Sequence, residues 1–150
     1  MTTDALEDWV ASTEGRLKNG GHRASAPRAA IIEVLGRQRC CVTAREIADL
    51  LREDGRDVGT ATVYRALELL HSIGAVQRLD TGEGFARYEP AFPSGEHHHH
   101  MLCERCGRVS HFEDERLEQA IHELAERLAY DVEGHDVMLR GACPACATAA

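Results

Sequence analysis

Residues His97–Cys106 read HHHHMLCERC, and the interpretation of the whole chain starts from this stretch. Four consecutive histidines lead directly into a C-x-x-C pair, and a second C-x-x-C pair, Cys143 and Cys146, lies near the C-terminus. Thiolates and imidazoles are the side chains that bind borderline-soft divalent metal ions best. Their clustering therefore predicts a metal-binding domain in the second half of the chain.

The two cysteine pairs predict one structural zinc site. Each C-x-x-C can turn two sulfurs toward one ion, so that the pairs together supply the four thiolates of a tetrahedral site: Cys103, Cys106, Cys143 and Cys146. Disulfides or a redox-active C-x-x-C are the alternatives. Nothing resembling a secretory signal opens the chain, so a reducing compartment is expected, and zinc is favoured there.

The histidine run can contribute to two different metal sites, because side chains of an extended segment alternate between its faces. His97 and His99 would share one face, and His98 and His100 would share the other. An affinity tag is an alternative explanation, but such tags lie at chain termini, whereas this run lies between two structured segments. A solvated loop is a further alternative.

Composition indicates a globular, cytoplasmic protein of one domain or two small ones. The 150 residues are 43% hydrophobic, and no apolar run approaches the roughly 18 residues of a membrane span. Residues 16–65 hold ten Arg or Lys against six Asp or Glu, a net of +4, whereas residues 91–150 hold five against eleven, a net of −6. The first half therefore suits a polyanion, and no membrane partner is expected.

Three short helices open the chain and suggest a helix-turn-helix core. Apolar residues at helical spacing predict the first over residues 6–18. The second begins around Pro27, a residue that fits the first turn of a helix. The third begins after Thr43, where T-A-R-E reads as a capping box with Glu46 reaching back to the cap.

A fourth helix, opened by G-T-A-T-V-Y-R at residues 59–65, has the properties of a recognition helix. Thr60 is expected to cap it, and it should end at Gly74. Thr62, Tyr64 and Arg65 lie in its first turns, where side chains of a recognition helix reach base edges and helix-terminal amides meet phosphate. An exposed Tyr beside an Arg is also compatible with an ordinary surface.

Alternating patterns after Gly74 predict a hairpin over residues 75–80 and 85–89, and a hairpin behind a recognition helix makes a winged helix. The second half predicts a strand at residues 108–112, a helix at 115–129 and a return strand within 132–140. The expected fold class is α/β (α+β). It combines a winged-helix domain over residues 1–90, a linker over 91–96 and a small zinc-pinned α/β domain over 97–150.

The order of these motifs resembles that of the ferric uptake regulator (Fur) family of metal-responsive repressors. The resemblance rests on G-T-A-T-V-Y-R-A-L, the wing, the linker, H-H-H-H-M-L-C-E-R-C-G and the terminal C-x-x-C, and it covers the chain from Leu17 to Cys146. It implies a homodimer with a DNA-binding winged helix and a C-terminal dimerisation domain. Metal binding at the hinge would set the angle between the two.

The resemblance also implies three metal sites. The four cysteines fall on a structural Zn²⁺ site. A second site, within the dimerisation domain, falls on His97, His99, Glu118 and His135. The sensing site between the domains falls on Glu89, His98, His100 and His111, and it would take Fe²⁺ or Zn²⁺, with Mn²⁺ as a further candidate.

At the sensing site the chain departs from the family pattern. Relatives that sense iron usually carry His where this chain has Cys41 and an acidic residue where it has His111. Relatives that sense zinc often carry Cys at the position of Glu89 and Asp or His at Gln77. The mixed donor set does not name a metal. Cys41 is either a ligand or a buried apolar side chain.

For double-stranded DNA, the resemblance implies that Thr62, Tyr64 and Arg65 contact the major groove and its phosphates, and that Arg23 contacts a narrow minor groove. The expected operators are A·T-rich inverted repeats, and the expected function is metal-dependent repression of genes for metal-ion uptake and homeostasis. Two alternatives are a peroxide-sensing member of the family and, from the histidines and carboxylates alone, a metalloenzyme. No motif such as H-E-x-x-H supports an enzyme.

Overall fold

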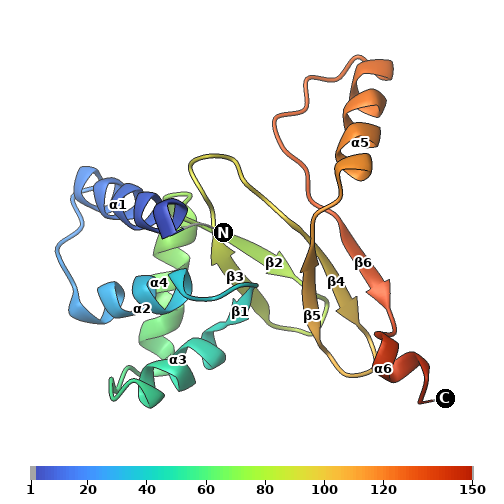
Figure 1. The fold of residues 1–150 in the computed structure, drawn as a ribbon. Coiled ribbons are helices and arrows are strands. Elements are labelled where there is room, and N and C mark those ends of the chain that lie inside the picture. The colour runs from blue at the N-terminus through green and yellow to red at the C-terminus, as the bar shows by residue number, and fades with distance from the viewer. Residues whose placement is uncertain (1–2, 150) are drawn as a thin grey trace. The chain divides into compact units, whose positions relative to one another are not determined.

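The computed structural model describes residues 3–149, which form two compact units divided between His97 and His98 (Figure 1). The first unit contains four helices and a three-stranded sheet. The second contains another three-stranded sheet and two helices. This mixture of helices and small sheets confirms the predicted α+β class. Within residues 3–149, no helix has the length and apolar character needed to cross a membrane.

The four helices of the first unit are α1 (Thr3–Asn19), α2 (Ala26–Gly36), α3 (Ala44–Glu53) and α4 (Thr60–Ser72). The predicted capping box of α3 is present, because Thr43 Oγ1 accepts from the Glu46 amide at 3.1 Å and Glu46 Oε2 accepts from the Thr43 amide at 2.7 Å. Pro27 occupies the first turn of α2, where its missing N–H costs no helical hydrogen bond.

The predicted cap of α4 is wrong by one residue. Gly59 is the N-cap, with an extended backbone and no side-chain hydrogen bond, while Thr60 is already helical. The Gly59 carbonyl accepts the first helical bonds, from the amides of Thr62 and Val63. The helix ends just before Gly74, whose φ of +69° lies in the left-handed region that glycine adopts without strain.

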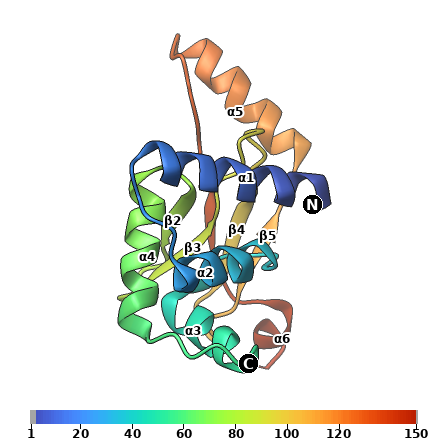
Figure 2. The same ribbon diagram turned by 90° about the vertical axis from the view of Figure 1, so that its left-hand side faces the viewer.

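The core of the first unit lies between these helices and one face of its sheet. Val63, Leu67 and Leu70 of α4 are fully buried, as their spacing predicts. The other large side chains with under 2% exposure include Trp9, Ile31, Leu35, Ile47, Leu51 and Tyr88. Figure 2 shows α1 crossing the end of α4 from which the chain enters the sheet.

The sheet of the first unit has the order β1-β3-β2, with β1 at Val42–Thr43, β2 at Val76–Asp80 and β3 at Ala86–Pro90. The hairpin of β2 and β3 confirms the predicted wing. Strand β1 has only two residues, too few to show a period in the sequence, and it pairs antiparallel with β3. Beyond β3, the Ala91 amide donates to the Ala75 carbonyl at 3.0 Å, and Phe92 packs against the core. The start of the expected linker thus belongs to the first unit.

The second unit contains β4 (His99–Cys103), β5 (Val109–Phe112), α5 (Glu115–Arg127), β6 (Met138–Gly141) and α6 (Pro144–Ala147). Its sheet has the order β5-β4-β6, and β4 runs antiparallel to β5 and parallel to β6. The strand expected within residues 132–140 forms only from Met138, since the preceding residues make an irregular loop. The four-residue α6, which carries Cys146, has no pattern that predicts it.

Helix α5 is amphipathic, yet none of its residues is buried. Its apolar residues recur at intervals of three and four positions: Leu117, Ile121, Leu124 and Leu128. Leu124 is nevertheless 43% exposed, and Leu128 is 58% exposed. An apolar stripe of this kind normally packs against another element. In the second unit it stays largely open to solvent.

Candidate metal centres and nucleic-acid interface

The four cysteines of the two C-x-x-C pairs meet in the second unit. Strand β4 ends at Cys103, a tight turn brings Cys106 back, and β6 delivers Cys143 and Cys146 to the same end of the sheet. Their four Sγ atoms lie within 4.8 Å of one another, and Cys106 and Cys143 are 3.9 Å apart. A tetrahedral ion with Zn–S bonds of about 2.3 Å separates its sulfurs by roughly 3.8 Å. The group therefore fits structural zinc.

The electrostatics of this group also fit a cation. The Cys143 amide donates to Cys103 Sγ at 3.3 Å, and this bond, with others from the backbone of the Cys106 turn, lowers the pKa of Cys103 to about 6. Hydrogen bonds with Cys143 and Cys106, burial and the charge of Cys103 raise the pKa of Cys146 to about 12. Four thiolates so close together need a central positive charge to ionise at once.

Disulfides do not form in this group. All six cysteines of the chain are free, and 3.9 Å between Cys106 and Cys143 is about twice the length of an S–S bond.

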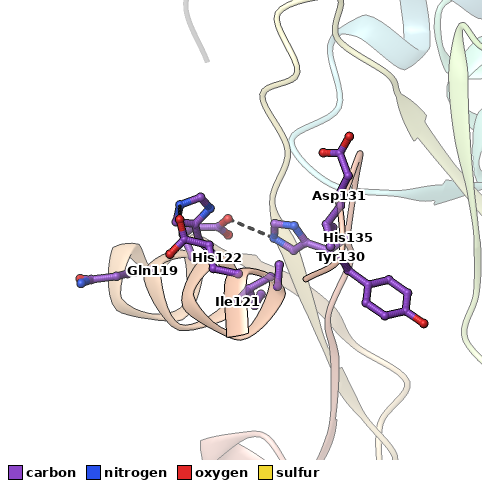
Figure 3. Close-up of a pocket in the computed structure, with 10 residues that line it drawn as sticks. Gln119, Ile121, His122, Tyr130, Asp131 and His135 are labelled. Carbon is purple, nitrogen blue, oxygen red and sulfur yellow. Dashed lines mark ion pairs between the residues drawn. The ribbon is translucent and has the colours of Figure 1, made fainter. Parts of the chain in front are cut away.

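A second cluster joins β4, α5 and the loop before β6. His99 Nε2 lies 2.7 Å from Glu118 Oε1, and His135 Nε2 lies 3.0 Å from Glu118 Oε2. The two imidazole rings are 5.2 Å apart. Figure 3 shows His135 directed from its loop toward α5, at the edge of a pocket that Glu118 also lines. Two ring nitrogens and a carboxylate so close together make a donor set suited to zinc or ferrous iron.

A third cluster lies on the other side of β4. The register pairs His100 with His111 of β5, and the His98 ring lies 4.9 Å from the rings of both. His98 and His100 therefore turn away from His99, as the alternation of an extended segment requires. His100 is buried, whereas His111 is exposed. The second unit brings together three of the residues expected in the sensing site.

The remaining residues expected to bind metal lie in the first unit. Glu89 sits on β3 with 5% exposure. Cys41 directly precedes β1, which pairs with β3, and the negative charge of Glu89 contributes to raising the pKa of Cys41. The larger causes are a hydrogen bond with Cys40 and burial. His97 is the last residue of this unit, and its Nδ1 lies 3.2 Å from the Gly95 carbonyl.

Sequence reasoning considered Cys41 and overlooked Cys40. The two sulfurs are 3.9 Å apart, and the Cys-Cys dipeptide that places them together is visible in the sequence. Because Cys41 is 5% exposed, held as a neutral thiol and close to Glu89, its surroundings differ from those of the zinc cysteines.

The residues expected to contact nucleic acid lie at the starts of α4 and α2. Tyr64 is 41% exposed, Arg65 is exposed and donates through Nε to the Ala61 carbonyl at 3.3 Å, and Thr62 is half-buried. Arg23 is exposed in the loop between α1 and α2, and its carbonyl accepts from the Arg28 guanidinium. Tyr64 and Arg65 thus present a phenol and a cation on the first turns of the helix.

The ferric uptake regulator family model matches residues 19–140 of the chain. Among curated relatives, the ferric uptake regulation protein of Legionella pneumophila is 36% identical over 132 residues, which are 87% of this chain and 96% of that protein. The protein of the same name from Vibrio anguillarum is 35% identical over 128 residues, 85% of each chain.

Solved structures give the same result. The Vibrio cholerae ferric uptake regulator matches with a TM-score of 0.75 at 34% identity, over 85% of this chain and 96% of that one. The Helicobacter pylori regulator matches with a TM-score of 0.81 at 27% identity, over 95% and 93%. Because these proteins are transcription regulators, the match decides against the metalloenzyme alternative. The chain belongs to the ferric uptake regulator family of metal-responsive regulators.

Proposed function

We propose that this protein is a cytoplasmic repressor of genes for metal-ion uptake and homeostasis, and that it binds DNA as a homodimer when its sensing site holds a metal ion. The convergence of His98, His100 and His111 on one side of β4 carries the proposal. His98 directly precedes β4, His100 lies on β4 and His111 lies on β5. Without a ligand, bringing three imidazoles this close together costs free energy, because it removes water from their ring nitrogens. They suit a divalent ion.

In this proposal Glu89 completes the sensing site from the first unit, and Cys41 is a further available donor. A carboxylate adds negative charge to the neutral imidazoles, so the set accepts Fe²⁺ or Zn²⁺, with Mn²⁺ as a further candidate. The Pseudomonas aeruginosa regulator, 28% identical with a TM-score of 0.73, was solved with manganese. This manganese-containing structure supports the proposal that a sensing site of this type binds more than one kind of metal ion.

Two further sites accompany the sensing site in the proposal. The cysteine group holds a structural Zn²⁺, and His97 joins His99, Glu118 and His135 in a site within the dimerisation domain. His97 and His99 are two residues apart, so an extended backbone turns both toward one face. The Helicobacter pylori regulator is described as having three functional metal binding sites, which agrees with this number.

Residues 1–90 form the proposed DNA-binding domain, 91–96 the hinge and 97–150 the dimerisation domain. On α4, Thr62, Tyr64 and Arg65 reach the major groove and its phosphates, and Arg23 reaches a minor groove narrowed by A·T pairs. A·T-rich inverted repeats are the proposed operators, because a two-fold symmetric dimer presents two α4 helices to two half-sites.

The open apolar stripe of α5 supports dimerisation through the second unit. Leu124 and Leu128 are 43% and 58% exposed, and Met101 and Leu139 of the sheet are 44% and 51% exposed. Burying large aliphatic side chains of this kind stabilises an interface by about 25 cal/mol per Å² of apolar area. A second copy of the chain supplies a matching surface by symmetry.

Regulation follows as a shift between populations. With the sensing site empty, the two winged helices of a dimer adopt many separations, and few match two half-sites on one duplex. Ligation by Glu89 on one side and by His98, His100 and His111 on the other selects the arrangements that do. To shift the dimer from mostly open to mostly closed, the ion must bind the closed arrangement about 5.5 kcal/mol more tightly than the open one. Several bonds from protein donors to one ion can supply this amount.

The test is fluorescence anisotropy of a labelled A·T-rich inverted-repeat duplex, with buffered zinc, ferrous iron or manganese added to protein that keeps only its cysteine-bound zinc. We expect one metal to activate binding. Glu89→Ala should abolish the activation while the dimer and the cysteine-bound zinc persist, and Glu7→Ala, an exposed control on α1, should behave as wild type. A normal metal response in Glu89→Ala would show that the assignment of Glu89 is wrong.

The same samples test the peroxide-sensing alternative. Ferrous protein treated with hydrogen peroxide would gain one oxygen on His98 or His100 in that case, and peptide mass spectrometry detects the change. Metal-activated binding without this modification supports the metal sensor.

A further inference from the structure

The three residues that connect α4 to β2, Ile73, Gly74 and Ala75, are held by side chains of α1. The Trp9 indole Nε1 donates to the Ala75 carbonyl at 2.7 Å, inside the core. Trp9 is 1% exposed, and Ala75 is 2% exposed. The Ala75 carbonyl also accepts from the Ala91 amide, so the group that depends on this bond is the buried indole N–H, which would cost about 1–3 kcal/mol if it had no acceptor. The bond therefore ties α1 to the start of β2.

Arg16 holds the same connection from the solvent side. Its Nη1 donates to the carbonyls of Ile73, at 3.1 Å, and of Gly74, at 2.5 Å. These carbonyls belong to the two residues that directly follow α4, and the C-terminal end of a helix carries a partial negative charge. A guanidinium there satisfies two acceptors and adds a favourable charge interaction.

The position of α1 is itself set by close packing on α2. Gly36 of α2 has no Cβ, and a Cβ built there would clash with Leu6 of α1. Leu17, near the other end of α1, is 7% exposed and belongs to the core. The helix therefore has a defined register from Leu6 to Leu17, although the family model match begins only at residue 19.

We propose that Arg16 is a positioning residue for DNA recognition: with Trp9, it fixes the connection between the recognition helix α4 and the wing strand β2. The DNA part of this inference rests on the proposed function. Only three residues join the two elements, and Gly74 among them, with a φ of +69°, has no Cβ to restrict its backbone. Backbone bonds from the Gly74 amide to the His71 carbonyl and from the Ala75 amide to the Leu70 carbonyl already close the end of α4. The bonds from α1 hold the carbonyl groups of the connection as well, so that α4 and the wing meet the duplex in one relative orientation.

Arg16 acts at a distance from the proposed base contacts. Ile73 lies nine positions after Tyr64, which corresponds to about 14 Å along the helix axis. The guanidinium lies at the C-terminal end of α4, whereas Tyr64 and Arg65 lie in its first turns. Its effect on DNA binding is therefore transmitted through the connection and requires no phosphate contact.

The test compares Arg16→Ala with Lys18→Ala, which removes a cation from the same helix, in metal-activated protein on the operator duplex at several salt concentrations. Arg16→Ala should weaken binding by about threefold to tenfold, the effect of losing charged hydrogen bonds that are partly screened by solvent. The slope of the logarithm of its binding constant against the logarithm of salt concentration should match that of the wild type. The affinity of Lys18→Ala should stay within about twofold of the wild-type value. Unchanged affinity in Arg16→Ala, or a slope lower by about one, would overturn the proposal, because the second result identifies a phosphate contact.

A second readout uses Trp9, the single tryptophan of the chain. Acrylamide should quench its fluorescence weakly in the wild type and more strongly in free Arg16→Ala, and DNA binding should restore the protection. Arg16→Lys should recover part of both effects, since an ammonium can still donate to these carbonyls. If acrylamide quenches Trp9 in Arg16→Ala no more strongly than in the wild type, the inference is wrong. Wild-type protein that binds no duplex with any metal contradicts the proposed function instead, and quenching of the free variants still tests the contact.

Discussion

Tyr88 provides a buried residue whose ionisation can be followed separately from metal binding. It is 1% exposed on β3, and its hydroxyl donates to Glu68 Oε1 at 3.0 Å. Burial first, and then the bond and charge of Glu68, raise its pKa to about 12. Because the folded state favours the protonated phenol, its contribution to stability is complete below the unfolded pKa of about 10 and is lost as pH rises to about 12. Ionising the phenol therefore costs roughly 2–3 kcal/mol more in the folded protein than in the unfolded chain.

Tyr88→Phe should therefore lower the free energy of unfolding by about 1 kcal/mol at pH 8, through loss of the hydrogen bond. It should also flatten the decline of stability between about pH 10 and pH 12, the unfolded and folded pKa values of the phenol. Urea unfolding at a series of pH values measures both effects. Tyr130→Phe, at a residue with 74% exposure, is the control and should leave the profile unchanged. Parallel declines in the wild type and Tyr88→Phe would contradict the role of the buried phenol.

Cys103→Ser tests the zinc assignment at the scale of one sulfur. We expect the variant to lose its zinc and the second unit to lose regular structure, because a structural zinc site contributes folding free energy directly. Zinc content after gel filtration and far-ultraviolet circular dichroism measure these outcomes. Cys40→Ser alters a cysteine of the first unit and should keep full zinc. Full zinc in Cys103→Ser would exclude the four-cysteine site.

Among the elements, α4 allows affinity and sequence preference to be separated. Arg65→Ala should weaken binding to all duplexes similarly and lower the salt slope by about one, as for a phosphate contact. Tyr64→Ala should instead change the preference among operator variants, because an exposed phenol in the first turns of α4 can reach base edges. Competition anisotropy with matched and altered half-sites measures both. Equal loss of preference in the two variants would contradict these roles.

At the scale of the whole molecule, the open stripe of α5 predicts the assembly state. Leu128→Asp should weaken the proposed dimer by roughly 30-fold or more, the effect of losing about 2 kcal/mol at an interface centre. Analytical ultracentrifugation over a range of concentrations measures the dissociation constant. Phe85→Asp places the same charge at a residue of the first unit with 42% exposure and should leave the dimer intact. A monomeric wild type, or a dimer unaffected by Leu128→Asp, would exclude this surface.

Local patterns in the sequence were sufficient to predict most of the elements. The capping box at Thr43 and Glu46, the apolar period of α4 and the alternation of the wing act over a few residues, so they can be recognised without the fold. The spacing of the two C-x-x-C pairs likewise pointed to zinc. The cap of α4 was misplaced, since Gly59 and Thr60 are both acceptable there and only the backbone conformation distinguishes them.

The sequence by itself determined helices α1 to α5, the wing and the presence of a cysteine site, and its resemblance to a family supplied the grouping of the other metal ligands. Only the tertiary structure decided that the two oxygens of Glu118 contact different histidines, Oε1 His99 and Oε2 His135. It alone also decided that Cys41 lies close to Glu89, and that Trp9 and Arg16 hold the end of α4. These contacts join residues as many as 66 positions apart. They depend on strand register and on packing between elements, because no local period or capping preference acts over that separation.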